Sequence, residues 1–432
     1  MATAFDHMNS STSSQVRISE FGRLEIFLVA MVIFVSNDTI SFGTNVDLGY
    51  QSFKYLIYSF ATFILLVKVN TRIFTPGLGG LLAIMVSVLL TAAVNFDSSG
   101  GYIYQLWMVL IGFLIVQNLR LEDFSRVFLR IILTLGFLSL LIFAAANFAP
   151  SIFDVFPVGE NSAGVEFHNL YIGSIYKEVA EVRNASIFRE PGVFMIYIMC
   201  SIIFEVFFTG ERRWKVLVLL IVVLITTYST AGFLLLPVLF VAYMLRGGAK
   251  ILGAKNVGIF AAFSGIAAVL SVQPEIYDAL FSKLSSDSAS FGSSLARIAS
   301  IVVNAQIFAE NPFFGAGLAG YGALFERYSS IHFGLPLQAS GQSTNTFMAL
   351  FATYGVLYGG VVVYALIRLT GRLSDRNFPK GLLFLVFAMM FSSQDLRYSL
   401  LFYILVFYGL QSTAVVGVSD NGGSAAQIRT SS

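Results

Sequence analysis

The residues best suited to bind an anion stand just before a long apolar run. Arg189 and Glu190 precede Pro191 and Gly192, and the apolar run follows at once. Proline suits the first turn of a helix, because the N–H that it lacks would have no partner there. We therefore expect the Arg189 and Glu190 side chains at a helix N-terminus, where backbone N–H groups attract negative charge. The alternative is that the two residues pair with each other as interfacial anchors.

A second arginine, Arg297, stands at the start of an amphipathic segment that ends at Glu310. Apolar residues recur there at helical spacing, so the segment is predicted to be a helix that lies on the bilayer surface or packs against the membrane spans. It is followed by residues 311–321, Asn-Pro-Phe-Phe-Gly-Ala-Gly-Leu-Ala-Gly-Tyr. The glycines either let the backbone approach a ligand closely or simply end the helix.

Several common catalytic signatures are missing from the sequence. It contains no Asp-X-Asp pair and no phosphate-binding Gly-X-X-X-X-Gly-Lys-Ser/Thr loop, which argues against a metal-dependent nucleotide-sugar enzyme and an ATP-driven pump. It has three histidines, His7, His168 and His332, with no cysteine cluster beside them. His332 is a candidate base, although histidines in loops are commonly only solvated. We expect no metal and no cofactor.

The composition indicates that lipid is the main solvent of the chain. Of its 432 residues, 56% are hydrophobic and only 12% are charged, about half the charged share of an ordinary soluble protein. The net charge of +2 is spread over short clusters, which argues against nucleic-acid binding. The only cysteine, Cys200, stands in an apolar run and is interpreted as a buried filler.

The predicted fold class is an all-α integral membrane protein with about twelve transmembrane helices. A spanning helix needs about 20 apolar residues. Runs of this kind occur at 24–42, 50–68, 78–95, 102–119, 127–149, 191–209, 256–273 and 344–367. Two longer stretches, 214–245 and 380–411, are each either one long helix or a hairpin. Hairpins are favoured, with turns at 228–232 and 392–397, because basic clusters flank the first stretch and charges at the bilayer centre are costly in the second.

The positive charges set the orientation. With both termini inside, 18 of the 26 Lys and Arg residues lie on the inner side, and Lys54 lies within a span near its outer end. Seven lie outside: Lys177, Arg183, Arg189, Lys283, Arg297, Arg327 and Arg397. The predicted organisation is a tail (1–20), helices one to five (21–149), outer loop one (150–190), helices six to nine (191–274), outer loop two (275–343), helices ten to twelve (344–411) and a second tail (412–432).

Polar residues gather in the two large outer loops and not inside the spans. Transporters that rock between two states tend to keep polar groups within their spans. The distribution therefore favours chemistry or recognition at the outer face, with a transporter or flippase of lipid-linked sugars as the alternative.

Three short motifs resemble one known family. Residues 188–192 (Phe-Arg-Glu-Pro-Gly) resemble the Arg-Glu-Pro signature of bacterial Wzy-type O-antigen polymerases and the related O-antigen ligases. Arg297 and the turn at 311–317 resemble the second outer loop of that family. Residues 343–359, which include Asn345, resemble the next span, although Thr344 stands where the family usually has histidine. Ser229 and Thr230 likewise replace a common Ser-Arg pair. The ligases are thought to depend on that histidine, so its absence favours polymerase over ligase.

The resemblance implies a glycosyltransferase of the bacterial inner membrane, multi-pass with cytoplasmic termini. Its donor would be an oligosaccharide linked to a polyprenyl pyrophosphate, and a chain-length regulator protein is a possible partner. Arginine forks bind phosphate oxygens in bidentate fashion, which makes a metal unnecessary. The implied diphosphate- or glycan-binding residues are Arg189 and Arg297, followed by Arg183, Arg327, Asn345 and Arg397, and the implied catalytic bases are Glu190 or His332. Tyr321 and Tyr328 are candidates to stack on sugar rings, or they are ordinary interfacial tyrosines.

Overall fold

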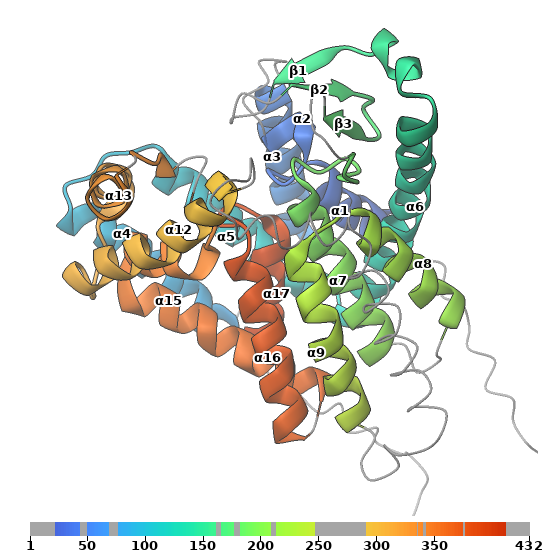
Figure 1. Ribbon diagram of the computed structural model, residues 1–432. Coiled ribbons are helices and arrows are strands. Elements are labelled where there is room, and N and C mark those ends of the chain that lie inside the picture. Colours follow the sequence, from blue (N-terminus) through green and yellow to red (C-terminus); the bar gives the residue numbers. More distant parts are fainter. Residues whose placement is uncertain are drawn as a thin grey trace, which may run out of the picture.

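The computed structural model describes residues 22–43, 50–68, 77–160, 166–176, 182–208, 213–246, 291–334, 336–339, 343–374 and 376–411. Nearly all regular structure in these ranges is helical (Figure 1). The helices are α1 (Arg23–Phe34), α2 (Ile40–Gly43), α3 (Tyr50–Lys68), α4 (Gly77–Val94), α5 (Gly101–Asn118), α6 (Leu121–Phe148), η1 (Pro150–Val155), α7 (Pro191–Phe207), α8 (Trp214–Thr226), α9 (Thr230–Arg246), α12 (Phe291–Glu310), α13 (Gly317–Phe333), α15 (Thr346–Leu373), α16 (Asn377–Ser392) and α17 (Leu400–Leu410).

Four of these helices, α4, α5, α6 and α15, are long and apolar enough to cross a membrane, and α7, α8, α9, α16 and α17 are shorter apolar helices. This is consistent with an all-α membrane protein. The predicted span at 256–273 lies outside the described residues, so the count of twelve spans remains a prediction.

Both ambiguous apolar stretches are divided into two helices. Helix α8 ends at Thr226 and α9 begins at Thr230, with Tyr228 between them at a positive φ of 46°. Likewise α16 ends at Ser392 and α17 begins at Leu400. The prediction that each stretch is divided by its polar residues is confirmed.

The first apolar run forms a shorter helix than predicted. The expected span was 24–42, but α1 ends at Phe34. The next residues use local side-chain bonds instead of helical ones: the Ser36 Oγ accepts from the Asp38 N–H at 3.1 Å, and the Thr39 hydroxyl donates to the Ser36 carbonyl at 2.9 Å. Ser, Asp and Thr side chains compete with the helix in this way. The polar residues after Phe34 therefore belong to a connection.

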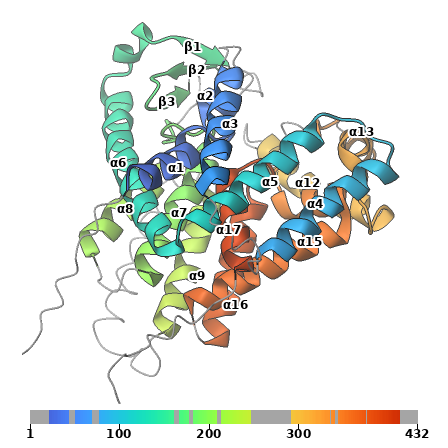
Figure 2. The same ribbon diagram turned by 180° about the vertical axis from the view of Figure 1, so that it is seen from behind.

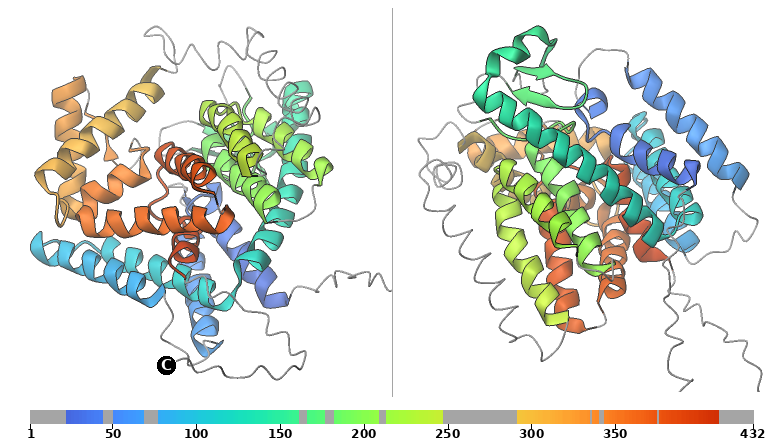
Figure 3. Two further views of the ribbon diagram at one scale, coloured as in Figure 1. Left: turned by 90° about the horizontal axis from the view of Figure 1, so that it is seen from below. Right: turned by 90° about the vertical axis from the view of Figure 1, so that its right-hand side faces the viewer.

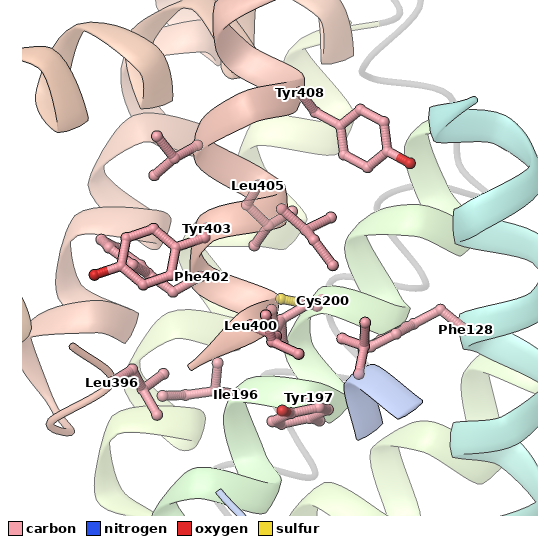
Figure 4. Close-up of a cluster of buried hydrophobic side chains, with 14 of the residues drawn as sticks. Phe128, Ile196, Tyr197, Cys200, Leu396, Leu400, Phe402, Tyr403, Leu405 and Tyr408 are labelled. Carbon is pink, nitrogen blue, oxygen red and sulfur yellow. The ribbon is translucent and has the colours of Figure 1, made fainter. Parts of the chain in front are cut away.

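Helices α7 and α17 form the centre of the molecule. Every residue of α17 is buried, as is nearly every residue of α7. Helix α17 packs against α5 and α15, and the views in Figures 1, 2 and 3 place it between the α4, α12, α13 and α15 group and the α6 to α8 group. Figure 4 shows side chains of α7 and α17 in one apolar cluster with Phe128 of α6, and Cys200 is a buried free thiol within it, as predicted. An apolar surface on all sides of a helix is typical of such a position.

Helix α15 is broken where the glycine-rich turn of loop two crosses it. Gly355 has a φ of 78° and ψ of −172°, and Gly315 in the turn has a φ of 65°. The two backbones are joined by hydrogen bonds from the Ala316 N–H to the Ala352 carbonyl at 2.9 Å and from the Val356 N–H to the Pro312 carbonyl at 2.8 Å. The close backbone approach that the glycines permit is therefore to α15. As predicted, α12 packs against the spans, because it contacts α15.

The same turn fixes the start of α13 on the α4–α5 connection. The Asp97 carboxylate accepts from the Ala319 N–H at 2.8 Å, and the Tyr102 hydroxyl accepts from the Leu318 N–H at 2.9 Å. These groups cap orphan N–H groups in the first turn of α13. Burial raises the pKa of Asp97, but the hydrogen bonds from Ala319 and Ser99 outweigh it and hold that pKa below its usual range.

Loop one departs from the all-α prediction. It contains a three-stranded antiparallel sheet, β1 (Val158–Glu160), β2 (Glu166–Asn169) and β3 (Ser174–Tyr176), in which His168 is opposite Val158 and Ile175. Figures 1 and 2 show the sheet beyond the C-terminal end of α6, beside α2. A small apolar cluster of Ala146, Phe153 and Ile175 joins the sheet to α6. The strands are too short to give a clear alternating pattern in the sequence.

Candidate functional site

The backbone around Arg189 is fixed from two sides. The Arg189 N–H donates to the Asp38 carbonyl at 2.9 Å, and its own carbonyl accepts from the Tyr176 hydroxyl of β3. Glu190 has an extended backbone, with φ −151° and ψ 149°, and α7 begins at Pro191. The helix predicted at this point is thus confirmed. The backbone from which the Arg189 side chain extends is therefore held in place.

The guanidinium of Arg189 has unused hydrogen-bonding capacity. Its Nη2 donates to the carbonyl of Asp395 at 2.6 Å, whereas its Nε is buried with no hydrogen-bond partner. No ion pair with Arg189 is formed by the described residues, Glu190 included, so the anchor-pair alternative is not what the structure shows. Gly192 leaves space for the side chain of Gln394, the residue before Asp395, because a Cβ at Gly192 would lie 2.3 Å from the Gln394 Nε2.

Asp395 and Arg397 form a bidentate ion pair in the α16–α17 connection. The Arg397 Nε and Nη2 donate to the two Asp395 carboxylate oxygens at 2.9 and 2.7 Å. Burial acts to raise the pKa of Asp395, but the neighbouring Arg397 holds it below its usual range. Burial acts in turn to lower the pKa of Arg397, and Asp395 raises it well above the usual range. Arg397 is therefore a neutralised cation, in contrast to Arg189.

Helix α13 covers this pair with an aromatic ring. The Arg397 guanidinium lies 4.8 Å from the centre of the Tyr321 ring, and the Tyr321 hydroxyl donates to Ser343 at 2.8 Å. Stacking of a guanidinium on an aromatic face is a favourable contact. One face of Tyr321 is thus occupied by protein.

The connection after α1 adds an amide and a carboxylate. The Asn37 Nδ2 donates to the Tyr104 hydroxyl at 2.9 Å and to the Tyr398 carbonyl at 3.3 Å, and its Oδ1 accepts from the buried Lys54 at 2.7 Å. Asp38 is 1% exposed and accepts from Tyr197 and Ser399.

These groups surround one cavity of about 410 Å³. Its walls come from five connections: the one after α1, the α4–α5 turn, the turn before α7, the loop-two region around α13, and the α16–α17 turn. All five are outer connections in the sequence-based topology. The lining residues are Asn37, Asp38, Gly43, Ser99, Gly101, Arg189, Leu318, Tyr321, Gly322, Ala339, Asp395, Arg397, Tyr398 and Ser399.

Arg297 does not line this cavity. It is half-buried on α12; burial lowers its pKa, and the charge of Glu190 opposes that shift. Glu190 is half-buried and does not line the cavity either. The structure therefore places Arg189, Glu190 and Arg297 in one electrostatic neighbourhood, with only Arg189 facing the cavity.

The remaining predicted residues lie elsewhere. Arg183 donates to the carbonyls of Thr227 and Tyr228, at 3.2 and 3.1 Å, and so ties loop one to the α8–α9 turn. The Asn345 side chain accepts from the Met348 N–H at 3.0 Å and caps α15.

Two more predicted residues are on the surface of α13. Arg327 is exposed, 5.8 Å from the Tyr328 ring centre, and His332 is exposed and bonded to Gln306 of α12. Neither lines the cavity. Their proposed roles remain predictions that the arrangement does not favour.

Three further residues that line the cavity, Asp38, Tyr398 and Ser399, were not predicted from the sequence. None of them belongs to a recognisable motif. One signal was available: two charged residues, Asp38 and Lys54, stand in two consecutive apolar runs. Ionisable residues inside apolar runs usually face a protein interior or a cavity.

A family model described as O-Antigen ligase matches residues 216–365, roughly a third of the chain. The matched segment includes Arg297, the glycine-rich turn and Asn345, but neither Arg189 nor Arg397. No curated protein matches the chain. The match supports the O-antigen ligase and polymerase family, and with it a role in surface polysaccharide or lipopolysaccharide assembly, without separating ligase from polymerase.

Proposed function

We propose that this chain is a polymerase of lipid-linked glycans. It joins oligosaccharide repeat units carried on polyprenyl pyrophosphate into long surface polysaccharide, at the outer face of the bacterial inner membrane. Both termini are cytoplasmic in this proposal, and a chain-length regulator is an expected partner. The family match and the apolar helices support the general class.

The observation that carries the proposal is the guanidinium of Arg189. It faces a cavity of about 410 Å³ that is formed by predicted outer connections, and no described residue forms an ion pair with it. A volume of this size suits a small polar ligand, since ligand sites commonly measure about 300–1,000 Å³. We infer that the ligand is the diphosphate of the donor together with its first sugar.

The chemistry of glycosyl transfer fits such a cation. As the bond between the sugar and the diphosphate breaks, positive charge develops on the sugar and the diphosphate leaves as an anion. A guanidinium binds phosphate oxygens through two parallel N–H bonds and stays charged at any relevant pH. Because this clamp stabilises the leaving group, we expect EDTA to leave the transfer rate unchanged.

Polymerase is favoured over ligase because no histidine is among the described residues that line the cavity. Thr344, where the resemblance leads one to expect histidine, has a hydroxyl with no hydrogen-bond partner. Ligase remains the second candidate because the family description names that activity. The transporter alternative gains little support, because the buried carboxylate of Glu205 forms an ion pair with Arg213 at the start of α8.

The test is a gel of surface polysaccharide from cells that lack the gene and from complemented cells. A polymerase leaves lipid A core capped by a single repeat unit when deleted. A ligase leaves bare core while polymer accumulates on the polyprenyl carrier. An unchanged ladder would eliminate both enzymes and revive the transporter alternative.

The orientation can be tested by cysteine labelling, because the natural Cys200 is buried and should not react. Phe96, in the α4–α5 turn, is 95% exposed. A Phe96→Cys variant should react with a membrane-impermeant maleimide added outside spheroplasts, whereas the unaltered chain should not. Labelling only after lysis would reverse the proposed orientation.

A further inference from the structure

The cavity has two carboxylates, and they are in different states. Among its lining residues only Asp38 and Asp395 are acids. Both oxygens of Asp395 are held by Arg397, so this carboxylate is neutralised and has a fixed place. Asp38 forms no ion pair with any described residue. An unpaired carboxylate in a polar cavity is a candidate proton acceptor.

The two carboxylate oxygens of Asp38 differ in their hydrogen bonding. Its Oδ2 accepts hydrogen bonds from the Tyr197 hydroxyl at 2.7 Å and from the Ser399 hydroxyl. Its Oδ1 accepts none from the described residues. Two donors on one oxygen fix the orientation of the group, as a general base requires. Since Asp38 is 1% exposed, the cavity is its route to a ligand.

The bases suggested by the sequence do not have this placement. Glu190 is outside the cavity and lies in the field of Arg297, and His332 is an exposed residue bonded to Gln306. Asp38, by contrast, lines the same cavity as Arg189, and its carbonyl accepts the Arg189 N–H. The backbone bond couples the position of the base to that of the diphosphate-binding arginine.

We propose that Asp38 is the general base that takes the proton from the acceptor hydroxyl; this rests on the proposed polymerase function. The O–H bond of the acceptor sugar breaks, and its proton goes to the Asp38 Oδ1. The freed electron pair of the acceptor oxygen forms the new bond to the anomeric carbon of the donor. The bond from that carbon to the diphosphate oxygen breaks, and its electron pair leaves with the polyprenyl diphosphate beside Arg189. Asp38 then releases the proton to water.

The pH dependence of this step must reflect all ionisable groups around Asp38. These are Tyr58 on α3, Tyr104 on α5, Tyr197 on α7, Lys54 by way of Asn37, and the other ionisable residues that line the cavity, Arg189, Asp395, Arg397 and Tyr398. Apart from Asp38, the only carboxylate in this set is Asp395, which is neutralised by Arg397. We therefore expect the acid limb of the pH–rate profile to be lost when Asp38 is replaced by Asn.

The experiment uses the purified full-length protein in lipid nanodiscs with a polyprenyl-pyrophosphate-linked repeat unit as donor and acceptor. Asp38→Asn, which keeps the shape of the side chain, should lower the polymerisation rate about 10²–10⁴-fold. Binding of a fluorescent donor should change less than about threefold, since binding depends on Arg189, and the residual rate should lose its acid limb. Asp38→Glu should recover part of the rate.

Two controls separate this role from a structural one. Tyr197→Phe removes one of the two donors that orient the Asp38 carboxylate, so it should lower the polymerisation rate and leave binding of the fluorescent donor unchanged. A structural role would instead lower stability and donor binding together. This variant also serves if Asp38→Asn does not fold. Asp395→Asn should retain an acid limb.

Each outcome has a separate meaning. If the unaltered protein polymerises and Asp38→Asn does so at a comparable rate, Asp38 is not the base and the polymerase function stands. If Asp395→Asn alone abolishes the acid limb, the base is Asp395. If the unaltered protein does not polymerise lipid-linked units, the proposed function fails and the assignment of Asp38 with it.

Discussion

Two turns of this molecule look alike in sequence and act in opposite ways. Residues 188–192 and residues 311–317 each combine proline and glycine next to a helix, and both resemble motifs of one family. The first turn directs a side chain, that of Arg189, into the cavity. The second directs its backbone into the break of α15, where Gly315 lies against the backbone of Thr353 and Gly355 against the backbone of Phe313.

The difference teaches that a motif can serve a site without touching its ligand. No residue of the second turn lines the cavity. The turn leads into α13, and Leu318, Tyr321 and Gly322 of that helix form part of the cavity wall. Substitutions in the first turn should therefore affect chemistry, and substitutions in the second should affect folding.

The largest effect is expected at Arg189. Arg189→Ala should lower the polymerisation rate about 10²–10³-fold, the usual loss when one preorganised charge-stabilising donor is removed. Arg189→Lys should recover only part, because a lysine is a point charge and cannot make two parallel bonds. The measurement is polymer length on a gel together with the rate of the purified enzyme at matched protein level. Full activity of Arg189→Ala would end the diphosphate-clamp proposal.

The second turn should show a stability effect. Gly315→Ala places a Cβ 2.3 Å from the Thr353 carbonyl at a φ of 65°, so we expect it to cost about 2–4 kcal/mol in folding free energy. Thermal unfolding in nanodiscs measures this loss. Gly360→Ala, on the same α15 with open space around its Cα, is the matched control and should be neutral. Equal behaviour of both variants would contradict the backbone-crossing role.

A smaller effect is expected at the cap of α13. Asp97→Ala removes the acceptor for the Ala319 N–H and should cost about 1 kcal/mol. Because the pKa of Asp97 is held below its usual range in the folded protein, its contribution is present above the unfolded-state pKa of about 4 and is lost as pH falls through the folded value. The difference in unfolding temperature between variant and parent should thus shrink at acid pH. A difference that does not change with pH would mean that the carboxylate charge is not what caps the helix.

The smallest effect is expected at His332. It is exposed on α13 and outside the cavity, so His332→Ala should leave the polymerisation rate within about twofold. Arg327→Ala, on the same exposed surface, should behave in the same way. A large loss of rate for either variant, at normal protein level, would mean that loop two reaches the substrate in a way that the present cavity does not include.

Much of the architecture could be predicted from the sequence, because apolar length and charge asymmetry are local signals. The hairpin at Tyr228 and the helix at Pro191 follow from such signals. The small sheet was missed because its strands have three or four residues. The site was predicted only in part. Arg189 and Arg397 were identified because each is a charged residue next to an apolar run.

The contact between Asp38 and Ser399 in the site was harder to predict. Asp38 and Ser399 are separated by 361 positions, and their contact depends on how α1 and α17 pack. That packing is a property of the tertiary structure, and no local sequence pattern predicts it.

The burial of α17 on all sides has a consequence for biosynthesis. The described helix nearest the C-terminus, α17, is also a central one, packed between α5 and α15. The ribosome synthesises α17 after every other described helix, so the earlier helices cannot complete their packing until α17 has been inserted. The same late segment carries Asp395, Arg397 and Ser399 into the cavity. A nascent chain thus has no complete cavity, and Arg189 gains the Asp395 carbonyl as a hydrogen-bond partner only after α16 has been synthesised.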